Sequence, residues 1–251
     1  MIFYVKHADQ DYQCDLTKPI DISIPVGQVK CFYSTDFRAT PYVSGKFVGA
    51  VSEGAPVNFF DIHLNPHGNG THTECFGHIT IEQESINDHL KQFHFVAKLV
   101  SIDLEKNSLG DQIITHKNIK EAISDHSSEA LIIRTLPNAE HKLNMDYSGT
   151  NPPYLDSEAM SYVVEIGVKH LLLDLPSVDR EEDEGILKAH HIFWNVIDKK
   201  GSVDTRKDCT ITELIFVPNH IEDGLYLLNI QIPSIQLDAV PSKPVLYKLS
   251  K

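Results

Sequence analysis

Two apolar runs, ALIIRT (residues 130–135) and HLLLD (residues 170–174), decide the fold class. Each run is short and continuous, as expected of a buried strand that is covered on both faces. They alternate with HKNIKEAI (residues 116–123) and DSEAMSYVVEI (residues 156–166), in which apolar residues recur at helical spacing and capping residues stand at the start. Helix and strand therefore alternate from residue 115 to 174, which predicts an α/β unit.

Further strands are expected on both sides of this unit. They alternate apolar and polar residues or are rich in Val and Ile, and they lie at residues 20–26, 57–64, 95–104, 209–217 and 226–232. A short helix is expected at residues 190–196. Because we find no internal repeat, low-complexity tract or linker, the sequence predicts a single α/β domain over residues 1–251 with a mixed β-sheet and packed helices.

Composition restricts the partners and the cellular compartment. The chain has 251 residues and a net charge of −13, which would repel phosphate groups and argues against binding to nucleic acid or to anionic membranes. No apolar stretch approaches the length of about 18 residues that a membrane span needs, and the N-terminus lacks a secretory signal pattern. The four cysteines are widely spaced and contain no CxxC pair, so we expect a reduced, cytoplasmic setting.

The densest chemical feature is the segment HGNGTHTECFGH at residues 67–78, which contains His67, His72, Glu74 and His78. Imidazole nitrogens and carboxylate oxygens are the ligands that Zn²⁺, Mn²⁺ and Fe²⁺ take from proteins. In an extended chain His72, Glu74 and His78 share one parity, and the glycines let the loop bend. The strand that ends at Leu64 would place this loop at a sheet edge. The alternative is a polar surface turn, which is the commoner explanation for any single histidine.

Three other segments carry candidate residues. The loop Asp174-Leu-Pro-Ser177-Val-Asp179 follows a buried strand, where active sites of α/β folds often lie. His190 and His191 are adjacent, so only one of them is expected to face a metal. Glu213 stands in a strongly apolar strand, where a charge needs a partner such as a cation, an Arg or a Lys.

Taken in this order, the four segments resemble the cyclase-like metal-dependent hydrolase family that includes bacterial kynurenine formamidase. Gly70-Thr71-His72, the acidic residue two positions later and His78 match the family's HxGTHxDxPxH signature, and DLPSVD at residues 174–179 matches its later aspartate-rich segment. The chain departs from the signature at three positions. Gly68 occupies the place of the first histidine, with His67 one residue earlier; Glu74 replaces Asp, and Phe76 replaces Pro. These changes indicate a divergent member.

The resemblance implies a layered α/β fold of the swivelling β/β/α type and one or two divalent ions, Zn or Mn. The metal ligands would be His67, His72, Glu74, His78, His190 and Glu213. His78 and His190 would be the catalytic residues, and the substrate would contact Phe76, Ser177 and Asp179. The resemblance further implies hydrolysis of a formamide or another, possibly cyclic, amide of a small molecule, and a homodimer or homotetramer. The alternatives are a non-catalytic metal- or ligand-binding protein on the same scaffold and an unrelated protein with a histidine-rich surface loop.

Overall fold

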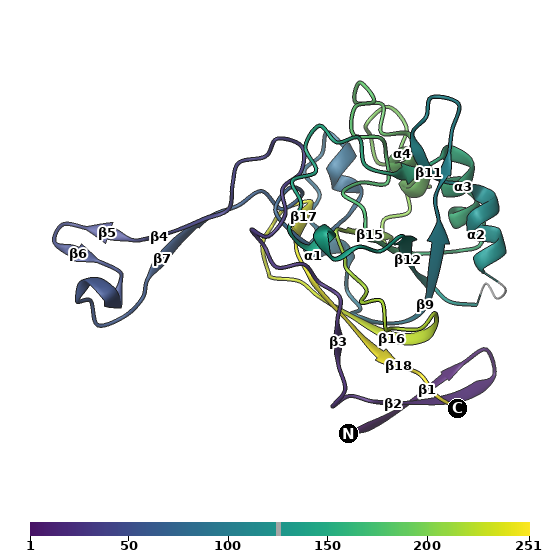
Figure 1. Cartoon of the computed structure of the whole chain (residues 1–251), viewed down its shortest axis with the longest axis horizontal. Helices are drawn as coiled ribbons and strands as arrows, with labels where there is room; N and C mark the ends of the chain where they lie inside the picture. The colour runs from purple at the N-terminus through teal and green to yellow at the C-terminus, as the bar shows by residue number, and fades with distance from the viewer. Residues whose placement is uncertain (124–126) are drawn as a thin grey trace.

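One curled sheet of nine strands carries the fold in the computed structural model, which describes residues 1–123 and 127–251 (Figure 1). In spatial order its strands are β17 (Ala239–Pro241), β8 (His72–Glu74), β15 (Thr210–Glu213), β14 (His170–Leu173), β12 (Ala130–Leu136), β9 (His94–Asp103), β16 (Gly224–Gln231), β18 (Lys243–Lys248) and β3 (Ile20–Asp21). The strands β15, β14, β12 and β9 are parallel, and those on either side pair antiparallel with their neighbours. The predicted α/β class with a mixed sheet is confirmed.

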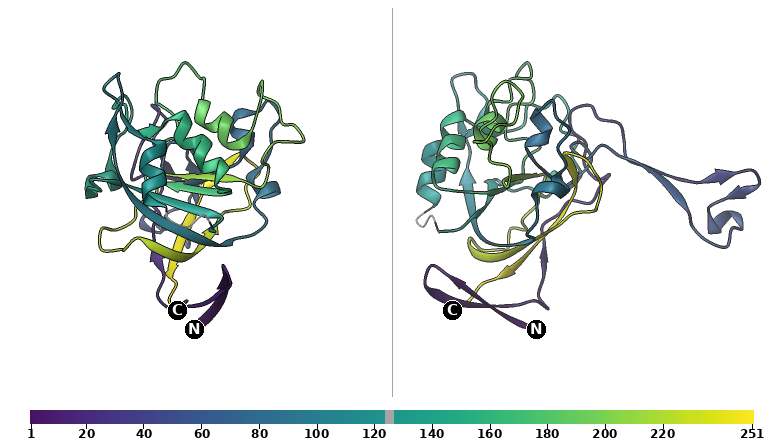
Figure 2. Two further views of the ribbon diagram at one scale, coloured as in Figure 1. Left: turned by 90° about the vertical axis from the view of Figure 1, so that its right-hand side faces the viewer. Right: turned by 180° about the vertical axis from the view of Figure 1, so that it is seen from behind.

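Three helices lie together against this sheet (Figure 2): α2 (His116–Ala122), α3 (Ser157–Glu165) and α4 (Lys188–Trp194). The first two begin where the sequence predicts. The Thr115 side chain accepts a hydrogen bond from the Asn118 amide, and Asp156 does the same for Ala159, which satisfies amides that have no partner within the helix. The predicted runs at 130–135 and 170–174 are strands buried along their whole length, except at the last residue of β12. The main hydrophobic core lies between these strands and the helices.

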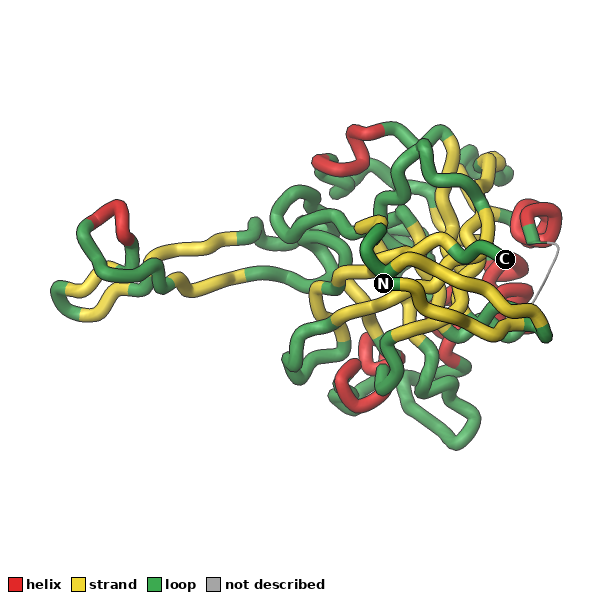
Figure 3. Tube along the Cα trace, turned by 90° about the horizontal axis from the view of Figure 1, so that it is seen from below, coloured by secondary structure: helices red, strands yellow, loops and turns green. Residues whose placement is uncertain are grey.

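Residues 38–63 form an arm that projects from the body of the molecule (Figures 1 and 3). Its antiparallel strands β4 (Arg38–Pro41) and β7 (Phe60–His63) lead to the pair β5 (Val43–Ser44) and β6 (Phe47–Val48) and to the 3-10 helix η1 (Val51–Glu53). The strand expected at residues 57–64 is therefore shorter than predicted, and it belongs to the arm. The sequence predicts that the histidine-rich segment lies at a sheet edge. Its residues His72 and Glu74 instead lie in β8, which is the second strand of the main sheet.

The strand expected at residues 20–26 is also shorter than predicted. Only Ile20–Asp21 pairs with β18, because the chain then crosses towards β15, where Ser23 forms an isolated bridge with Ile215. The Ile24 amide next donates a hydrogen bond to Thr71 Oγ1 at 2.6 Å, which ties this segment to the loop before β8.

The remaining elements are short. They are β1 (Ile2–His7) and β2 (Gln10–Asp15), which form a hairpin beside the C-terminus, η2 (Phe76–Ile79), α1 (Ile86–His89), η3 (Glu140–Asn144), and a small sheet of β10 (Glu105–Lys106), β11 (Gln112–Ile114) and β13 (Tyr154–Leu155). All four cysteines are buried and unpaired. Within residues 1–123 and 127–251, no helix is long and apolar enough to cross a membrane.

Candidate metal centre

Strand pairing assembles the floor of the site. In the antiparallel register of β8 and β15, His72 lies directly opposite Glu213. Directly opposed residues project from the same face of a sheet, so His72 Nε2 lies 3.4 Å from Glu213 Oε2. Glu74, two residues after His72, projects from that face as well, as the parity of the sequence predicts. All three side chains are buried.

The loop before β8 supplies His67. Its Nδ1 atom lies 3.2 Å from Glu74 Oε2. The neighbouring Gly68 packs so closely against Ser34 that a Cβ atom at position 68 would collide with the Ser34 side chain. A histidine therefore does not fit at residue 68, and the displaced His67 supplies the imidazole.

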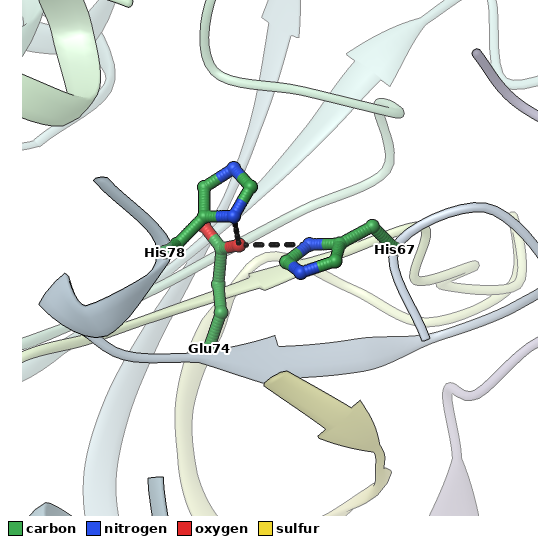
Figure 4. Close-up of side chains that lie close together, drawn as sticks. All are labelled: His67, Glu74 and His78. Atoms are coloured by element: carbon green, nitrogen blue, oxygen red, sulfur yellow. Dashed lines mark ion pairs between the residues drawn. The ribbon is translucent and has the colours of Figure 1, made fainter. Parts of the chain in front are cut away.

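His78 approaches the same carboxylate beside His67. It lies in the 3-10 helix η2, and its Nδ1 atom is 3.9 Å from Glu74 Oε2. Figure 4 shows the imidazoles of His67 and His78 directed at one oxygen of Glu74, with 4.2 Å between the ring centroids.

Helix α4 adds His190, and Asp179 fixes its orientation. The Asp179 carboxylate accepts hydrogen bonds from the backbone amides of Ala189 (2.7 Å) and His190 (3.0 Å). It also lies 2.6 Å from His190 Nδ1, so the other ring nitrogen, Nε2, faces Glu74 Oε1 at 3.2 Å. The adjacent His191 points elsewhere, with its Nδ1 atom 2.7 Å from the Val196 carbonyl oxygen. Only one of the two adjacent histidines reaches the site, as expected.

The same loop positions Glu213. The Val178 amide donates a hydrogen bond of 3.0 Å to Glu213 Oε1, which leaves Oε2 facing His72. The segment at residues 174–179 therefore orients two candidate ligands, His190 through Asp179 and Glu213 through Val178.

Burial makes this cluster a good fit for a divalent cation. Two of its buried atoms, His72 Nε2 and Glu74 Oε2, have no hydrogen-bond partner within the part of the chain that the structure describes, which is costly for polar atoms away from water. Candidate ligand atoms of His67, Glu74 and His78, and separately of His72, Glu74 and Glu213, lie within 4.8 Å of one another. Glu74 belongs to both groups. Imidazole and carboxylate donors suit Zn²⁺ or Mn²⁺.

The charges agree with this fit. Burial on its own lowers the pKa of His190, but the hydrogen bonds with Asp179 and Glu74 raise it to about 10. For Glu74, burial raises the pKa, but the neighbouring His78 and His190 lower it by more. The pKa of Glu74 therefore lies well below its usual range. Protonated histidines thus balance the carboxylates, and a divalent cation would balance the same charge while displacing those protons.

A pocket of about 670 Å³ opens above the cluster. Its deep side is lined by His67, His78, His190 and Glu213, and its wall by residues that include Phe32 and Ser177. A rim of charged residues at 180–184 completes it. This volume lies within the range of small-molecule sites, about 300–1,000 Å³.

The substrate-contact residues expected from the sequence divide into three cases. Ser177 lines the pocket, whereas Asp179 is engaged with His190. The expectation for Phe76 requires correction: its side chain is 1% exposed and packs edge-on against His89, in the core rather than in the pocket. The residue lies in η2, whose turn directs His78 towards the site and Phe76 away from it. The pocket's aromatic residue is instead Phe32.

Asp238 is a member of the cluster that sequence reasoning missed. Its Oδ2 atom lies 3.0 Å from His67 Nε2 and 3.4 Å from His78 Nδ1. In the sequence Asp238 lies in the segment QLDAVP, which contains no other candidate metal ligand and no motif that indicates a site.

Fold and site together define an α/β protein with a candidate divalent-metal centre at the base of a small-molecule pocket. Residues 14–180, more than half of the chain, match the family described as "Putative cyclase". The chain belongs to this cyclase family, as the motif resemblance predicts. The match ends before His190 and Glu213, so these two residues are assigned to the site by geometry. No curated protein matches the sequence significantly.

Solved structures with low sequence identity share the fold. A potential metal-dependent hydrolase with cyclase activity has 14% identity and a TM-score of 0.64, over 93% of this chain and 99% of that chain. An isatin hydrolase bound to the product analogue thioisatinate has 13% identity and a TM-score of 0.64, over 93% of both chains. Isatin hydrolase A from Labrenzia aggregata, bound to benzyl benzoate, has 15% identity and a TM-score of 0.64, over 92% and 93%. The fold of 92–93% of the chain is thus shared with these structures.

Proposed function

We propose that this protein is a metal-dependent hydrolase of a small-molecule amide, either a formamide of the kind an arylformamidase cleaves or a cyclic amide. The observation that carries the proposal is the pair of buried ligand atoms, His72 Nε2 and Glu74 Oε2, which form no hydrogen bond within the described residues and lie at the base of an open pocket. Family membership and the isatin hydrolases among the structural neighbours support the reaction class, because the isatin ring contains an amide.

The proposed ligands of a Zn or Mn site are His67, His72, Glu74 and Glu213, together with His190, whose Nε2 lies 3.2 Å from Glu74 Oε1. Glu74 belongs to both candidate groups and would be shared by two ions. A divalent ion held there supplies Lewis acidity, which activates water and polarises the amide carbonyl. The protein's own part is to hold these donors in place before substrate arrives. Asp179 and the Val178 amide do so for His190 and Glu213.

Exposure separates the proposed roles of His78 and His190. His190 is 2% exposed and is hydrogen-bonded through both ring nitrogens, whereas the side chain of His78 is 28% exposed and lines the pocket. A group that protonates the departing amine must reach the substrate. We therefore assign proton transfer to His78 and a binding role to His190. Phe32 and Ser177 are the proposed substrate contacts on the pocket wall.

Metal analysis combined with an amide panel tests this function. Tag-free protein is expected to carry one or two equivalents of Zn or Mn and to hydrolyse at least one of N-formylkynurenine, N-formylaniline and isatin. His72→Ala should lose metal and activity together. His78→Gln should keep metal and lose about 10²–10⁴ of the rate, the usual contribution of a general acid or base. His220→Ala, an exposed histidine outside the cluster, is the control.

Two results would contradict the proposal. Metal-loaded protein that binds but does not cleave the panel amides would favour a non-catalytic binding protein on this scaffold. Loss of metal in His78→Gln would make His78 a ligand and remove its assignment to proton transfer.

We also propose that the chain forms a homo-oligomer through the arm of residues 38–63. A two-stranded ribbon is at best marginally stable alone in water. This ribbon nevertheless exposes 56% of Phe59 and 64% of Ile62, and exposed apolar side chains gathered on one element mark an interface. Sedimentation equilibrium should give a dimer or larger, and Ile62→Lys should shift it to monomer. Val203→Lys, at a 98% exposed site outside the arm, should not. A wild-type monomer at micromolar concentration would refute the proposal.

A further inference from the structure

Asp238 reaches the metal cluster through strand pairing at the edge of the sheet. It immediately precedes β17, whose residues Ala239 and Val240 pair with Glu74 and Thr73 of β8. The Cys75 amide donates a hydrogen bond of 3.0 Å to the Asp238 carbonyl oxygen. The backbone of Asp238 is therefore fixed beside the strand that carries two candidate ligands.

The Asp238 carboxylate contacts the displaced histidine at the ring nitrogen that faces away from Glu74. His67 directs Nδ1 towards Glu74 Oε2 (3.2 Å) and Nε2 towards Asp238 Oδ2 (3.0 Å). The ring therefore lies between two carboxylates. The Glu74 carboxylate is fully buried, whereas Asp238 is 31% exposed and lines a separate cavity. The longer contact of Asp238, 3.4 Å, is with His78 Nδ1.

A cation bound by His67 Nδ1 would fix the tautomer of His67. Each ring nitrogen faces a carboxylate, Nδ1 at 3.2 Å from Glu74 Oε2 and Nε2 at 3.0 Å from Asp238 Oδ2. Binding through the Nδ1 lone pair leaves the ring proton on Nε2, where it donates to Asp238. A metal-binding histidine commonly donates its second N–H to a carboxylate in this way, which fixes the ring and raises its basicity as a ligand.

We propose that Asp238 is a positioning residue that accepts a hydrogen bond from His67 Nε2–H and thereby orients His67 Nδ1 towards the metal site. The need for it follows from the loop. Gly68 has no room for a side chain, so the imidazole comes from one residue earlier, on a turn that β8 does not hold in register. A carboxylate supplied by a different strand fixes that ring. This inference rests on the proposed metal site but not on any substrate.

The test measures metal affinity, by competition of Zn²⁺ or Mn²⁺ between a chelating dye and the purified full-length chain. Asp238→Ala is expected to weaken binding about 10- to 100-fold, the usual effect of losing such a partner. Asp238→Asn should recover most of that loss, because its amide oxygen still accepts from Nε2–H. Asp88→Asn, an exposed aspartate that lines the same separate cavity as Asp238, is the matched control. In ¹⁵N NMR of the metal-loaded wild type, His67 should carry its proton on Nε2, and a proton on Nδ1 would refute the inference.

Each adverse outcome identifies what has failed. Wild-type protein that takes up no metal would overturn both this inference and the proposed function. Wild-type protein that binds metal, with an Asp238→Ala affinity within twofold, would overturn the inference alone. Loss of a whole metal equivalent in Asp238→Ala without rescue by Asn would make Asp238 a ligand, which also refutes a positioning role.

Discussion

Replacing Lys142 by Met should destabilise the protein by about 3 kcal/mol, because it leaves the buried Asp174 carboxylate without its cationic partner. Lys142 Nζ lies 2.8 Å from Asp174 Oδ2, and the side chains are 13% and 0% exposed. Removing one partner of a buried pair typically costs about 3–5 kcal/mol. The lower end applies here, since the Thr135 amide and hydroxyl still donate to Asp174 at 3.0–3.2 Å. For a chain of this size the melting temperature should fall by about 6–12 °C.

The loss of stability in Lys142→Met should also depend on pH, in a predictable direction. Burial raises the pKa of Asp174, and the Lys142 ammonium opposes that rise. Without the ammonium the pKa rises further, so the folded variant holds a proton that the unfolded chain has lost. Its stability therefore declines as pH rises through that pKa, and the penalty shrinks towards pH 4.

Urea unfolding at pH 4.5, 6 and 8 measures both effects. The double variant Lys142→Met/Asp174→Asn should recover most of the stability, because a neutral amide needs no cation. Lys243→Met is the matched control: its pair with Asp21 is 64% and 46% exposed, so it should cost no more than about 1 kcal/mol. A loss below about 1 kcal/mol for Lys142→Met, or one that does not vary with pH, would refute the reasoning.

Three further predictions concern other buried residues. Burial lowers the pKa of His170 to about 4, so between pH 6.5 and 4 this histidine is protonated in the unfolded chain but neutral in the folded one. The free energy of unfolding should therefore decrease by up to about 3 kcal/mol as the pH falls from 6.5 to 4. Urea titrations should show a smaller decrease for His170→Asn. Phe76→Ala should cost about 3–5 kcal/mol by opening a core cavity, yet leave KM unchanged in steady-state assays; a large rise in KM would return Phe76 to the pocket. Asp179→Ala should weaken metal binding about 10- to 100-fold in chelator competition, because His190 loses its hydrogen-bond acceptor, and unchanged affinity would contradict that role.

Much of the fold could be predicted because its signals are local. The helix at α2 begins at its Thr115 cap, and the buried strands β12 and β14 are continuous apolar runs, so neighbours within a few residues define them. The arm could not be predicted. Alternation of apolar and polar residues indicates a strand at β7 but does not say which strand it pairs with, and here the partner is β4 rather than the main sheet.

The sequence by itself determined the chemistry of the site: the donor types, the shared face of His72 and Glu74, and the need of Glu213 for a partner. Only the tertiary structure decided which groups meet. His67 and Asp238 are 171 residues apart, and their contact depends on β17 pairing with β8. Gly68 excludes a histidine at its own position only because Ser34 packs against it. Residue type and local periodicity are properties of short segments, whereas the convergence of these side chains on one site depends on the pairing of distant strands.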